Sequence, residues 1–324
     1  MTNFALCNLK SNRMKTTNRY QGVVVPMVTP VTQDGRIDTA AVARIVDRLA
    51  SHQVAPLLMG TTGEGNSVSQ RQGVELIAAA ASAAQGRVTL YAGLPGCCVS
   101  EQLESARLFV EAGADVIAAT LPSYYALTPE QMYAYYEGMA DRLPVPLMLY
   151  NIDKTTHMSI PLDVIERLSH HPNIAGLKDS ENNVPRLQEA LALFGGREGF
   201  SYFCGCAANS TVALCHGADG IVPSIGNYAP QAFQALFEAA VSGEVERAQQ
   251  LQQLTNDLAK ANTQGLTLGQ SLAGLKLIMH EHGLCDPYML PPLTRLVPET
   301  EALVLEKYHA TCARYADQLS ALQG

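Results

Sequence analysis

The sequence predicts a (β/α)8 barrel followed by a helical extension at the carboxyl-terminal end. Eight short apolar runs alternate with segments long enough for helices, which is typical of parallel sheets whose strands are joined by helices. Each run is apolar throughout, as expected for strands buried on both faces. After about residue 229 no further strand pattern occurs. A length of 324 residues is compatible with one domain of this class.

The eight apolar runs give the predicted strands in chain order. They cover residues 22–28, 56–60, 88–93, 115–120, 146–150, 174–178, 200–205 and 220–223. In such a barrel the catalytic groups lie where the strands end, at the carboxyl-terminal face. The residues at the end of each run are therefore the first candidates for a functional site.

Helix signals occupy the segments between the strands. Asp38 precedes a run whose apolar residues recur with a 3.6-residue period. Thr128 and Gln131 form a capping-box pattern, with Pro129 at the first helical position. Asn183 can begin the helix that follows the sixth strand. Further helices are expected at residues 230–242, 244–263, 270–282 and 298–320.

We divide the chain into three parts. Residues 1–19 are polar and basic and lack the apolar core of a secretion signal, so we expect a flexible extension. Residues 20–228 form the barrel, and residues 229–324 form a helical extension packed with it as one unit. Because the first segment lacks a secretion signal, we expect a cytoplasmic protein, and no apolar run approaches the ~18 residues of a spanning helix.

The composition excludes several classes of partner. A hydrophobic content of 47% supports a large core, and a net charge of −8 disfavours nucleic acid and anionic membranes as partners. The eight cysteines are expected to stay reduced. Cys204 and Cys206, with Cys215 and His216, fit no usual zinc spacing, so we expect no metal.

A lysine at the end of the sixth strand is the most informative residue. Of the seven lysines, only Lys178, within residues 176–180, closes an apolar strand. Partial burial disfavours the ammonium form and leaves more of the free amine that attacks a ketone. A lysine that merely extends its charge to the barrel rim would explain this stretch equally well, so the other strand ends must decide.

Two further strand ends carry groups that suit an amine nucleophile. The turn with Thr61, Thr62 and Gly63 offers N–H groups and hydroxyls that can hold a carboxylate or phosphate, although such turns also occur without a ligand. Tyr150 can relay protons, or it can be a plain rim aromatic. Together with Lys178 they predict a Schiff base with an α-keto acid, whose iminium then acts as an electron sink.

These motifs, at residues 60–64, 150–152 and 176–180, resemble the dihydrodipicolinate synthase/N-acetylneuraminate lyase family over about residues 20–310. The resemblance implies a class I, pyruvate-dependent aldolase on a (β/α)8 barrel with a helical extension. It implies a covalent Schiff base with the substrate and no metal or added cofactor. It also implies a homo-oligomer, commonly a tetramer built from two tight dimers.

The resemblance assigns the roles residue by residue. Lys178 resembles the Schiff-base lysine, and Tyr150 resembles the tyrosine that shuttles protons to the carbinolamine and the substrate. Thr61 resembles the hydroxyl of that proton relay. Thr62 resembles the residue that binds the carboxylate of the keto acid. Tyr124 resembles a relay tyrosine that a neighbouring subunit lends across the dimer interface.

Gly205 and Val222 resemble positions that line the pocket on strands seven and eight.

The chain differs from the family pattern at two places near the pocket. Dihydrodipicolinate synthases carry an arginine five residues beyond the relay tyrosine, for the carboxylate of the second substrate, aspartate semialdehyde. Thr155 occupies this position, and the neighbouring Lys154 lacks the bidentate fork of arginine. Sialic acid lyases carry an acidic pair after the strand-seven glycine, where this chain has Cys206 and alanines.

From these departures we expect an enzyme that forms or cleaves a 2-keto-3-deoxy sugar acid, or a related hydroxy-keto acid, from or to pyruvate and an aldehyde. Thr155, Thr156 and Asp153 can read a polyol chain, or they can be plain loop residues. Three alternatives stay open: a 4-hydroxy-tetrahydrodipicolinate synthase of lysine biosynthesis, a keto-acid-binding barrel without catalysis, and a phosphate-binding barrel enzyme using residues 224–227.

Overall fold

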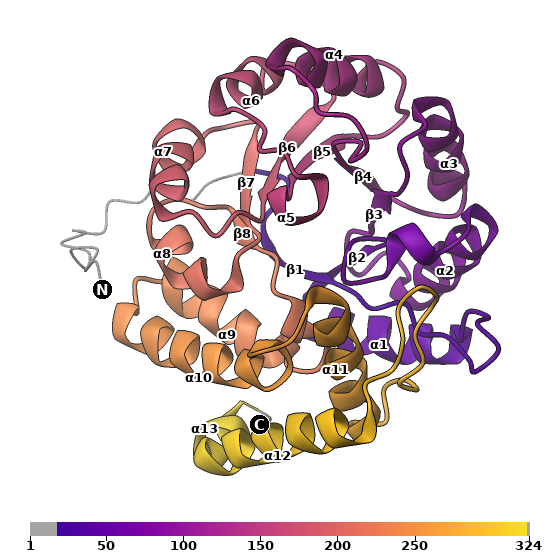
Figure 1. Cartoon of the computed structure of the whole chain (residues 1–324). Helices are drawn as coiled ribbons and strands as arrows, with labels where there is room; N and C mark the ends of the chain where they lie inside the picture. The colour runs from indigo at the N-terminus through magenta and orange to yellow at the C-terminus, as the bar shows by residue number, and fades with distance from the viewer. Residues whose placement is uncertain (1–17, 323–324) are drawn as a thin grey trace.

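The computed structural model describes residues 18–322, and within them eight parallel strands close into a barrel at the centre of the molecule (Figure 1). Each strand pairs with the next in chain order, and β8 pairs with β1. The strands are β1 Gly22–Pro26, β2 Ala55–Leu58, β3 Tyr91–Leu94, β4 Val116–Thr120, β5 Leu147–Asn151, β6 Ile174–Asp179, β7 Ser201–Cys204 and β8 Gly220–Ile221. Every predicted strand overlaps an observed one, so the predicted fold class is confirmed.

Helices surround the barrel and continue beyond it (Figure 1). Asp38 caps α1, its Oδ1 accepting from Ala41 N at 3.0 Å, and Thr128 opens α4 with the predicted capping box. The helices are α1 Thr39–Ser51, α2 Gln70–Ala84, α3 Val99–Glu111, α4 Pro129–Ala140, α5 Asp153–Thr156, α6 Leu162–Leu168, α7 Val184–Phe194, α8 Ser210–Cys215, α9 Pro230–Val241, α10 Val245–Thr263, α11 Leu268–Glu281, α12 Pro298–Arg314 and α13 Ala316–Ala321.

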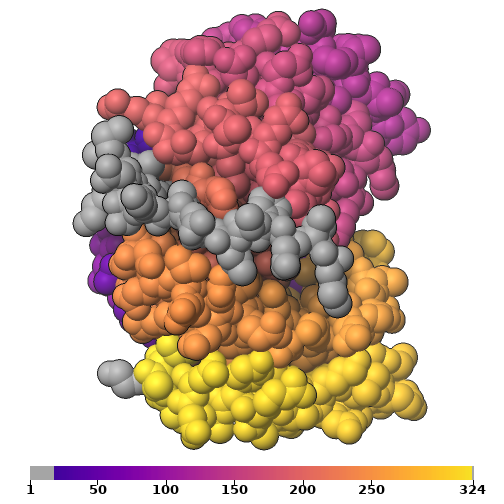
Figure 2. All heavy atoms as spheres, turned by 90° about the vertical axis from the view of Figure 1, so that its left-hand side faces the viewer, coloured from indigo at the N-terminus to yellow at the C-terminus, as the bar shows by residue number. Residues whose placement is uncertain are grey.

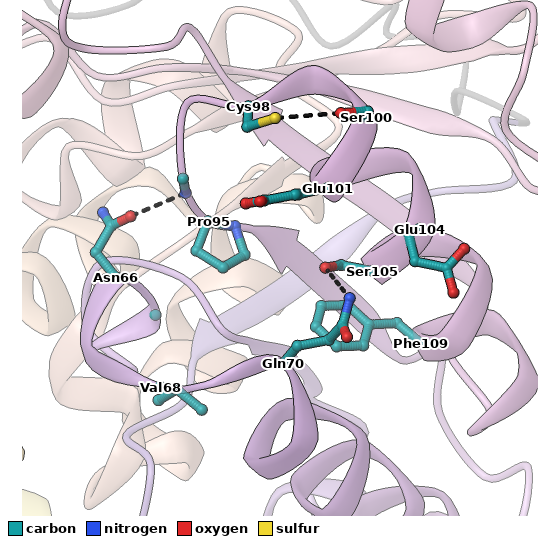
Figure 3. Close-up of a pocket in the computed structure, with 12 residues that line it drawn as sticks. Asn66, Val68, Gln70, Pro95, Cys98, Ser100, Glu101, Glu104, Ser105 and Phe109 are labelled. Carbon is teal, nitrogen blue, oxygen red and sulfur yellow. Dashed lines mark hydrogen bonds between the residues drawn. The ribbon is translucent and has the colours of Figure 1, made fainter.

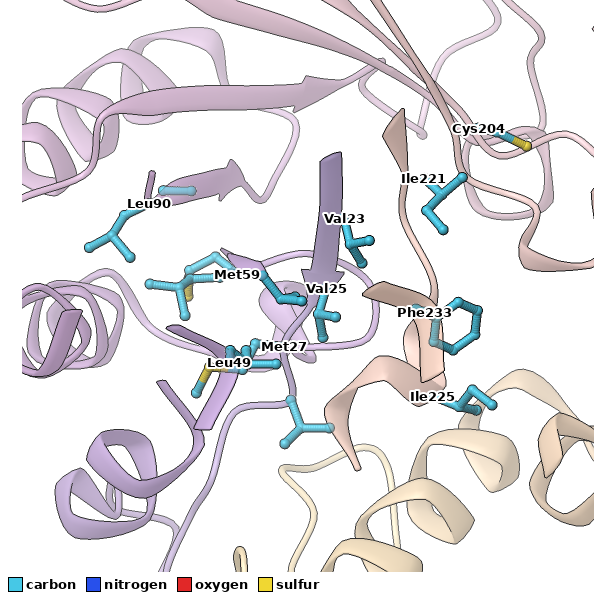
Figure 4. Packing of buried hydrophobic residues seen from close by; sticks show 14 of the residues in the cluster. Val23, Val25, Met27, Leu49, Met59, Leu90, Cys204, Ile221, Ile225 and Phe233 are labelled. Atoms are coloured by element: carbon cyan, nitrogen blue, oxygen red, sulfur yellow. The ribbon is translucent and has the colours of Figure 1, made fainter. Parts of the chain in front are cut away.

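The core has an inner and an outer layer, because successive side chains of a strand point to opposite faces. In β1, Val24 belongs to the cluster inside the barrel, whereas Val23 and Val25 belong to the cluster between strands and helices. Figure 4 shows part of this outer cluster. The inner cluster consists of Tyr20, Val24, Leu57, Tyr91, Val116, Ala118, Met148, Phe203 and Val222.

The helical extension lies on one side of the barrel. Helix α12 packs on α10 and α11, and Figure 2 shows α12 and α13 as the outermost layer of that side. Helix α9, which our division at residue 228 assigns to the extension, follows β8 and packs on β1. The three-part division of the chain stays a prediction.

The predicted amino-terminal extension lies mostly outside the described residues, which begin at Asn18. That side chain is buried, and its Nδ2 donates to Asp219 Oδ1 at 3.0 Å and to Arg197 O at 2.8 Å. Asn18 therefore ties the described start of the chain to the loops around β7 and β8. No helix between residues 18 and 322 is long and apolar enough to cross a bilayer.

Candidate active site

The pairing of β5 with β6 brings Tyr150 directly opposite Lys178. The register shifts between Leu147 and Met148, so that Leu147 faces Ile174 but Met148 faces Gly176. Lys178 is only 4% exposed, and its Nζ lies 3.6 Å from the centroid of the Tyr150 ring. Amine and phenol, 28 residues apart in sequence, are thus neighbours near the carboxyl-terminal ends of adjacent strands.

No ion pair joins Lys178 to a carboxylate among the residues that the structure describes. A buried ammonium usually needs such a partner, because burial removes the water that stabilises its charge. The aromatic face of Tyr150 is a weaker substitute. The surroundings of Lys178 therefore suit an amine that reacts rather than one that holds the fold together.

The hydroxyl of Tyr150 is embedded in polar contacts. Its Oη lies 3.3 Å from Thr61 Oγ1, and Lys178 and Ser180 also hydrogen-bond to the phenol. Burial alone would raise the pKa of Tyr150, but the Lys178 charge and these hydrogen bonds outweigh it and hold the pKa below the ordinary value. A phenol of lowered pKa gives up and takes back a proton more readily, which is what a relay needs.

The turn after β2 forms the wall next to the phenol. Thr61 and Tyr150 line a cavity of about 30 Å³, which has room for about one water-sized group. Thr62 is buried, and the Gly63 carbonyl accepts from Thr29 Oγ1 at 2.5 Å. A Cβ on Gly63 would lie 2.8 Å from the Met27 carbonyl oxygen, so the turn packs too closely on β1 for a larger residue.

Two of the predicted pocket residues come directly after strands β7 and β8 of the barrel wall. Gly205 follows β7, and a Cβ there would lie 2.2 Å from Ser180 Oγ, the hydroxyl that contacts Tyr150. Val222 follows β8 and belongs to the cluster inside the barrel. Only a glycine fits beside Ser180, which explains the residue type at position 205.

The remaining two predicted site residues lie outside the strands. Thr155 lies on α5, where the sequence suggested a loop, and its N–H donates to the Ile152 carbonyl at 3.3 Å. Tyr124 lies on the connection between β4 and α4, is 80% exposed, and packs edge-to-face on Tyr125. Among the described hydrogen bonds and ring contacts, none joins Tyr124 to Tyr150.

A polar network behind the strand ends was missed by the sequence-based prediction. Asn151 Nδ2 donates to Asp179 Oδ1 at 2.9 Å, and Arg186 Nε lies 2.8 Å from Asp179 Oδ2. Burial raises the pKa of Asp179, and Arg186 opposes this shift. Asn151 and Asp179 directly follow Tyr150 and Lys178, so the network fixes the two strand ends relative to each other. The sequence offers one signal for this network. Because side chains alternate along a strand, the residues that follow the inward-facing Tyr150 and Lys178 are expected to face outward as a pair.

A larger groove of about 580 Å³ adjoins the β2 turn on its outer side (Figure 3). It is lined by the β2 turn, the loop after β3 and α3, and Asn66 Oδ1 accepts from Gly96 N at 3.1 Å across it. Its charged lining residues are Glu101 and Glu104, and Lys178 does not reach it. The groove therefore lacks the nucleophile that the chemistry of the strand ends requires.

The cysteines and the loop after β8 are the other candidate sites that the sequence raised. From residue 18 to residue 322, no three His, Cys, Asp or Glu side chains are arranged to hold a metal ion. In the segment proposed as a phosphate site, Asn227 is buried and its Nδ2 donates to the Pro26 carbonyl at 2.9 Å. Its polar atoms serve the contact between β1 and the loop after β8.

Comparisons with known proteins identify the family to which this arrangement belongs. The model of the dihydrodipicolinate synthetase family matches residues 19–308. This chain belongs to that family. A 4-hydroxy-tetrahydrodipicolinate synthase from Corynebacterium aurimucosum is 32% identical over 288 residues, which cover 87% of this chain and 91% of the relative.

Solved structures of the family share the fold. The dihydrodipicolinate synthase of Bacteroides thetaiotaomicron is 26% identical and superposes with a TM-score of 0.85, over 90% of this chain and 99% of that one. The chloride-inhibited enzyme of Acinetobacter baumannii, complexed with pyruvate, is 26% identical with a TM-score of 0.81, over 90% and 98%.

Membership of the family establishes the class of chemistry. Its enzymes are pyruvate-dependent lyases of the aldolase type, and they work through a covalent Schiff base between a lysine and pyruvate, with no external cofactor. The protein is therefore a class I aldolase of this family. The expected family and enzyme class are confirmed, whereas the acceptor and the role of each residue need their own argument.

Proposed function

We propose that Lys178 forms the Schiff base with pyruvate and that the protein uses it to make or break a bond to an aldehyde carbon. The observation that carries this proposal is the position of Lys178 Nζ over the Tyr150 ring at 3.6 Å, with no carboxylate paired to the amine among the described residues. The amine attacks the ketone carbon of pyruvate, and the resulting carbinolamine loses its oxygen as water. Tyr150, connected to Thr61, supplies the proton that leaves with this water.

The iminium then draws electrons from the methyl carbon of pyruvate. Loss of a proton from that carbon gives an enamine, and the enamine carbon bonds to the aldehyde carbon; in the reverse direction this bond breaks. Water finally releases the product and returns the amine. In this proposal the N–H groups of Thr62 and Gly63 hold the pyruvate carboxylate, and Gly205 and Val222 line the pocket.

For the acceptor, the names of the relatives support a 4-hydroxy-tetrahydrodipicolinate synthase better than the sugar-acid enzyme that we expected from the sequence. We therefore place condensation of pyruvate with aspartate semialdehyde first. Lys154 is the cation proposed to face the carboxylate of this acceptor. Lys154 directly precedes Thr155 on α5 and its side chain is exposed, so its ammonium is accessible to a substrate carboxylate.

Thr155 supports a second candidate. It occupies the position of the acceptor-binding arginine, and loss of a charge-assisted hydrogen bond weakens carboxylate binding by about 1.5–3 kcal/mol. A hydroxyl suits a polyol better than a carboxylate. The second candidate is therefore formation or cleavage of a 2-keto-3-deoxy sugar acid, or a related hydroxy-keto acid, with Thr155 as a substrate-binding residue.

Reductive trapping tests the Schiff base. The protein is incubated with pyruvate, reduced with borohydride and digested, and we expect a mass gain on the peptide that contains Lys178. The gain should be absent in Lys178→Met. An unmodified wild-type protein would contradict the proposed function.

Parallel turnover assays then decide the acceptor. One follows the consumption of aspartate semialdehyde in the presence of pyruvate, and the other follows the release of pyruvate from 2-keto-3-deoxygluconate, at equal enzyme concentration. A kcat/KM at least about 100-fold higher for one substrate assigns the acceptor class. Replacing Thr155 by Arg should improve the first reaction and weaken the second.

We propose further that Tyr124 completes the proton relay of a second subunit, within a dimer of dimers. The proposal rests on the exposure of both Tyr124 and Tyr125, two large apolar side chains at the same surface point of one protomer. Tyr124→Ala should reduce turnover, and Tyr124→Ala mixed with Lys178→Met should recover part of it through hybrid dimers. Light scattering gives the oligomeric state, and a monomer at assay concentration would contradict this proposal.

A further inference from the structure

The turn that carries Thr61 and Thr62 is held in an unfavourable backbone conformation. Met59 and Glu64, at its two ends, have φ of 58° and 55°, in the left-handed region that side chains with a Cβ rarely adopt. Such conformations cost about 1–3 kcal/mol each and persist only when the surroundings hold them. The question is therefore which contacts keep this turn in place.

Glu64 makes its contacts in the helical extension, not in the barrel. Its side chain is fully buried, and Oε1 lies 2.5 Å from Nζ of Lys276 on α11. Its other oxygen, Oε2, accepts from Leu290 N at 2.8 Å. Lys276 is 1% exposed, and its Nζ also donates to the Tyr288 carbonyl at 2.7 Å. One buried ion pair thus joins the β2 turn to α11 and to residues 288–290.

We infer that the Glu64–Lys276 ion pair positions the pyruvate-binding turn, so that the helical extension takes part in substrate binding. This inference rests on the proposed function, in which the turn holds the carboxylate. Glu64 directly follows the N–H groups of Thr62 and Gly63, and its N–H donates to the Thr61 carbonyl at 3.1 Å. A change of the Glu64 backbone therefore moves both the carboxylate site and the residue that contacts Tyr150.

The expected effect is on binding more than on chemistry. If the turn occupies its competent conformation only part of the time, the apparent Kd for pyruvate rises by the inverse of that fraction. Once pyruvate is bound as a Schiff base, the covalent bond and the carboxylate contacts hold the turn. Glu64 and Lys276 are thus positioning residues, which act through Thr61 and Thr62.

The test uses the double variant Glu64→Gln/Lys276→Met in the full-length protein. It removes both charges together, so that no unpaired buried charge is left, and the amide oxygen of the glutamine can still accept from Leu290 N. We expect the KM for pyruvate to rise about tenfold, with kcat at saturating pyruvate within about threefold of the wild type. Lys276→Met alone should raise the KM at least as much and lower Tm further.

Asp257→Asn is the matched control, because it also removes a carboxylate of the extension. The Asp257 carboxylate accepts hydrogen bonds from Lys260 and Tyr315, and neither of these residues contacts the β2 turn in the described contacts. It should lower Tm without changing the KM for pyruvate.

Two outcomes overturn the inference in distinguishable ways. If the double variant is trapped by pyruvate and also turns over with the wild-type KM for pyruvate, the positioning role is contradicted and the proposed function is left intact. A wild-type protein that traps no pyruvate removes both the proposed function and the inference that rests on it.

Discussion

Two lysines of this protein are almost fully buried, and their surroundings are opposite. Lys178 lies in the barrel, 4% exposed, with its amine over the Tyr150 ring and no carboxylate paired to it in the described part of the chain. Lys276 lies on α11, 1% exposed, and holds both the Glu64 carboxylate and a backbone carbonyl. Burial is similar in the two cases, so burial alone does not identify a nucleophile.

The difference lies in what compensates the charge. A buried amine with a carboxylate at 2.5 Å serves as a structural cross-link. A buried amine without a paired carboxylate is available to attack a ketone. The missing carboxylate suits the proposed reaction of Lys178, whereas the carboxylate of Glu64 connects Lys276 to the β2 turn.

The largest expected effect concerns which of the two lysines forms the adduct with pyruvate. Lys178→Met should abolish borohydride trapping of pyruvate and reduce turnover by more than about 1,000-fold, because it removes the proposed nucleophile. Lys276→Met should still trap pyruvate at high concentration. Peptide mass spectrometry of both variants decides, and an adduct on the α11 peptide in the wild type would reverse the two roles.

Tyr150→Phe tests the partner of the reactive lysine. The ring under the amine is kept, but the proton relay is lost, so we expect kcat to fall by about 100-fold or more. The lowered pKa of Tyr150 means that its ionisation should appear in the pH–rate profile below the ordinary value for tyrosine, near 10. This alkaline limb should disappear in the variant; a limb that stays in place belongs to another group.

Stability should respond in the opposite order to activity. Lys276→Met leaves Glu64 buried and unpaired, and should lower the free energy of unfolding by about 3–5 kcal/mol. Lys178→Met removes a buried amine that has no carboxylate, and should change this free energy by less than about 1 kcal/mol, or raise it. Denaturant titration of both variants measures the two values, and equal losses would show that the lysines are held alike.

The Asp257 carboxylate on α10 should give the smallest effect, confined to low pH. Hydrogen bonds from Lys260 and Tyr315 lower the pKa of Asp257 to about 2, against about 3.9 in an unfolded chain. A depressed carboxyl pKa contributes stability above pH 4 that is lost as the pH falls toward 2. The Tm of the wild type and of Asp257→Asn should therefore converge between pH 4 and pH 2. A constant Tm difference across this range would contradict the lowered pKa.

The sequence was sufficient to predict what local patterns encode. Apolar runs gave the eight strands, Asp38 and Thr128 gave helix starts, and the strand-end position singled out Lys178. The role of Lys276 was not predictable in this way. It lies within a segment that was correctly expected to be helical, and its partner Glu64 is 212 residues earlier in the chain. A contact of that kind depends on how the helical extension packs on the barrel. Local sequence patterns carry no information about this packing.

The acceptor was harder to predict than the nucleophile for a similar reason. Lys178 and Tyr150 are fixed by strand pairing, which allows one arrangement. Thr155 and Lys154 lie on the one-turn helix α5, which the sequence suggested was a loop. The direction of a short surface helix depends on its neighbours, so residue types there indicate a substrate only weakly. The names of the relatives therefore changed our order of acceptors without changing the chemistry.

The irregular pairing between β5 and β6 limits how this chain can vary. Had the pairing of Leu147 with Ile174 continued without interruption, Tyr150 would lie opposite Leu177, and Lys178 would face Asn151. The additional residue in β6, Ala175, brings the amine and the phenol into line. Loops around the barrel can gain or lose residues with little consequence. A residue inserted between Leu177 and Lys178 would instead place Lys178 opposite Asn151 and turn its side chain to the other face. Every catalytic side chain would remain present, so an alignment that scores only residue identity would still report an intact site.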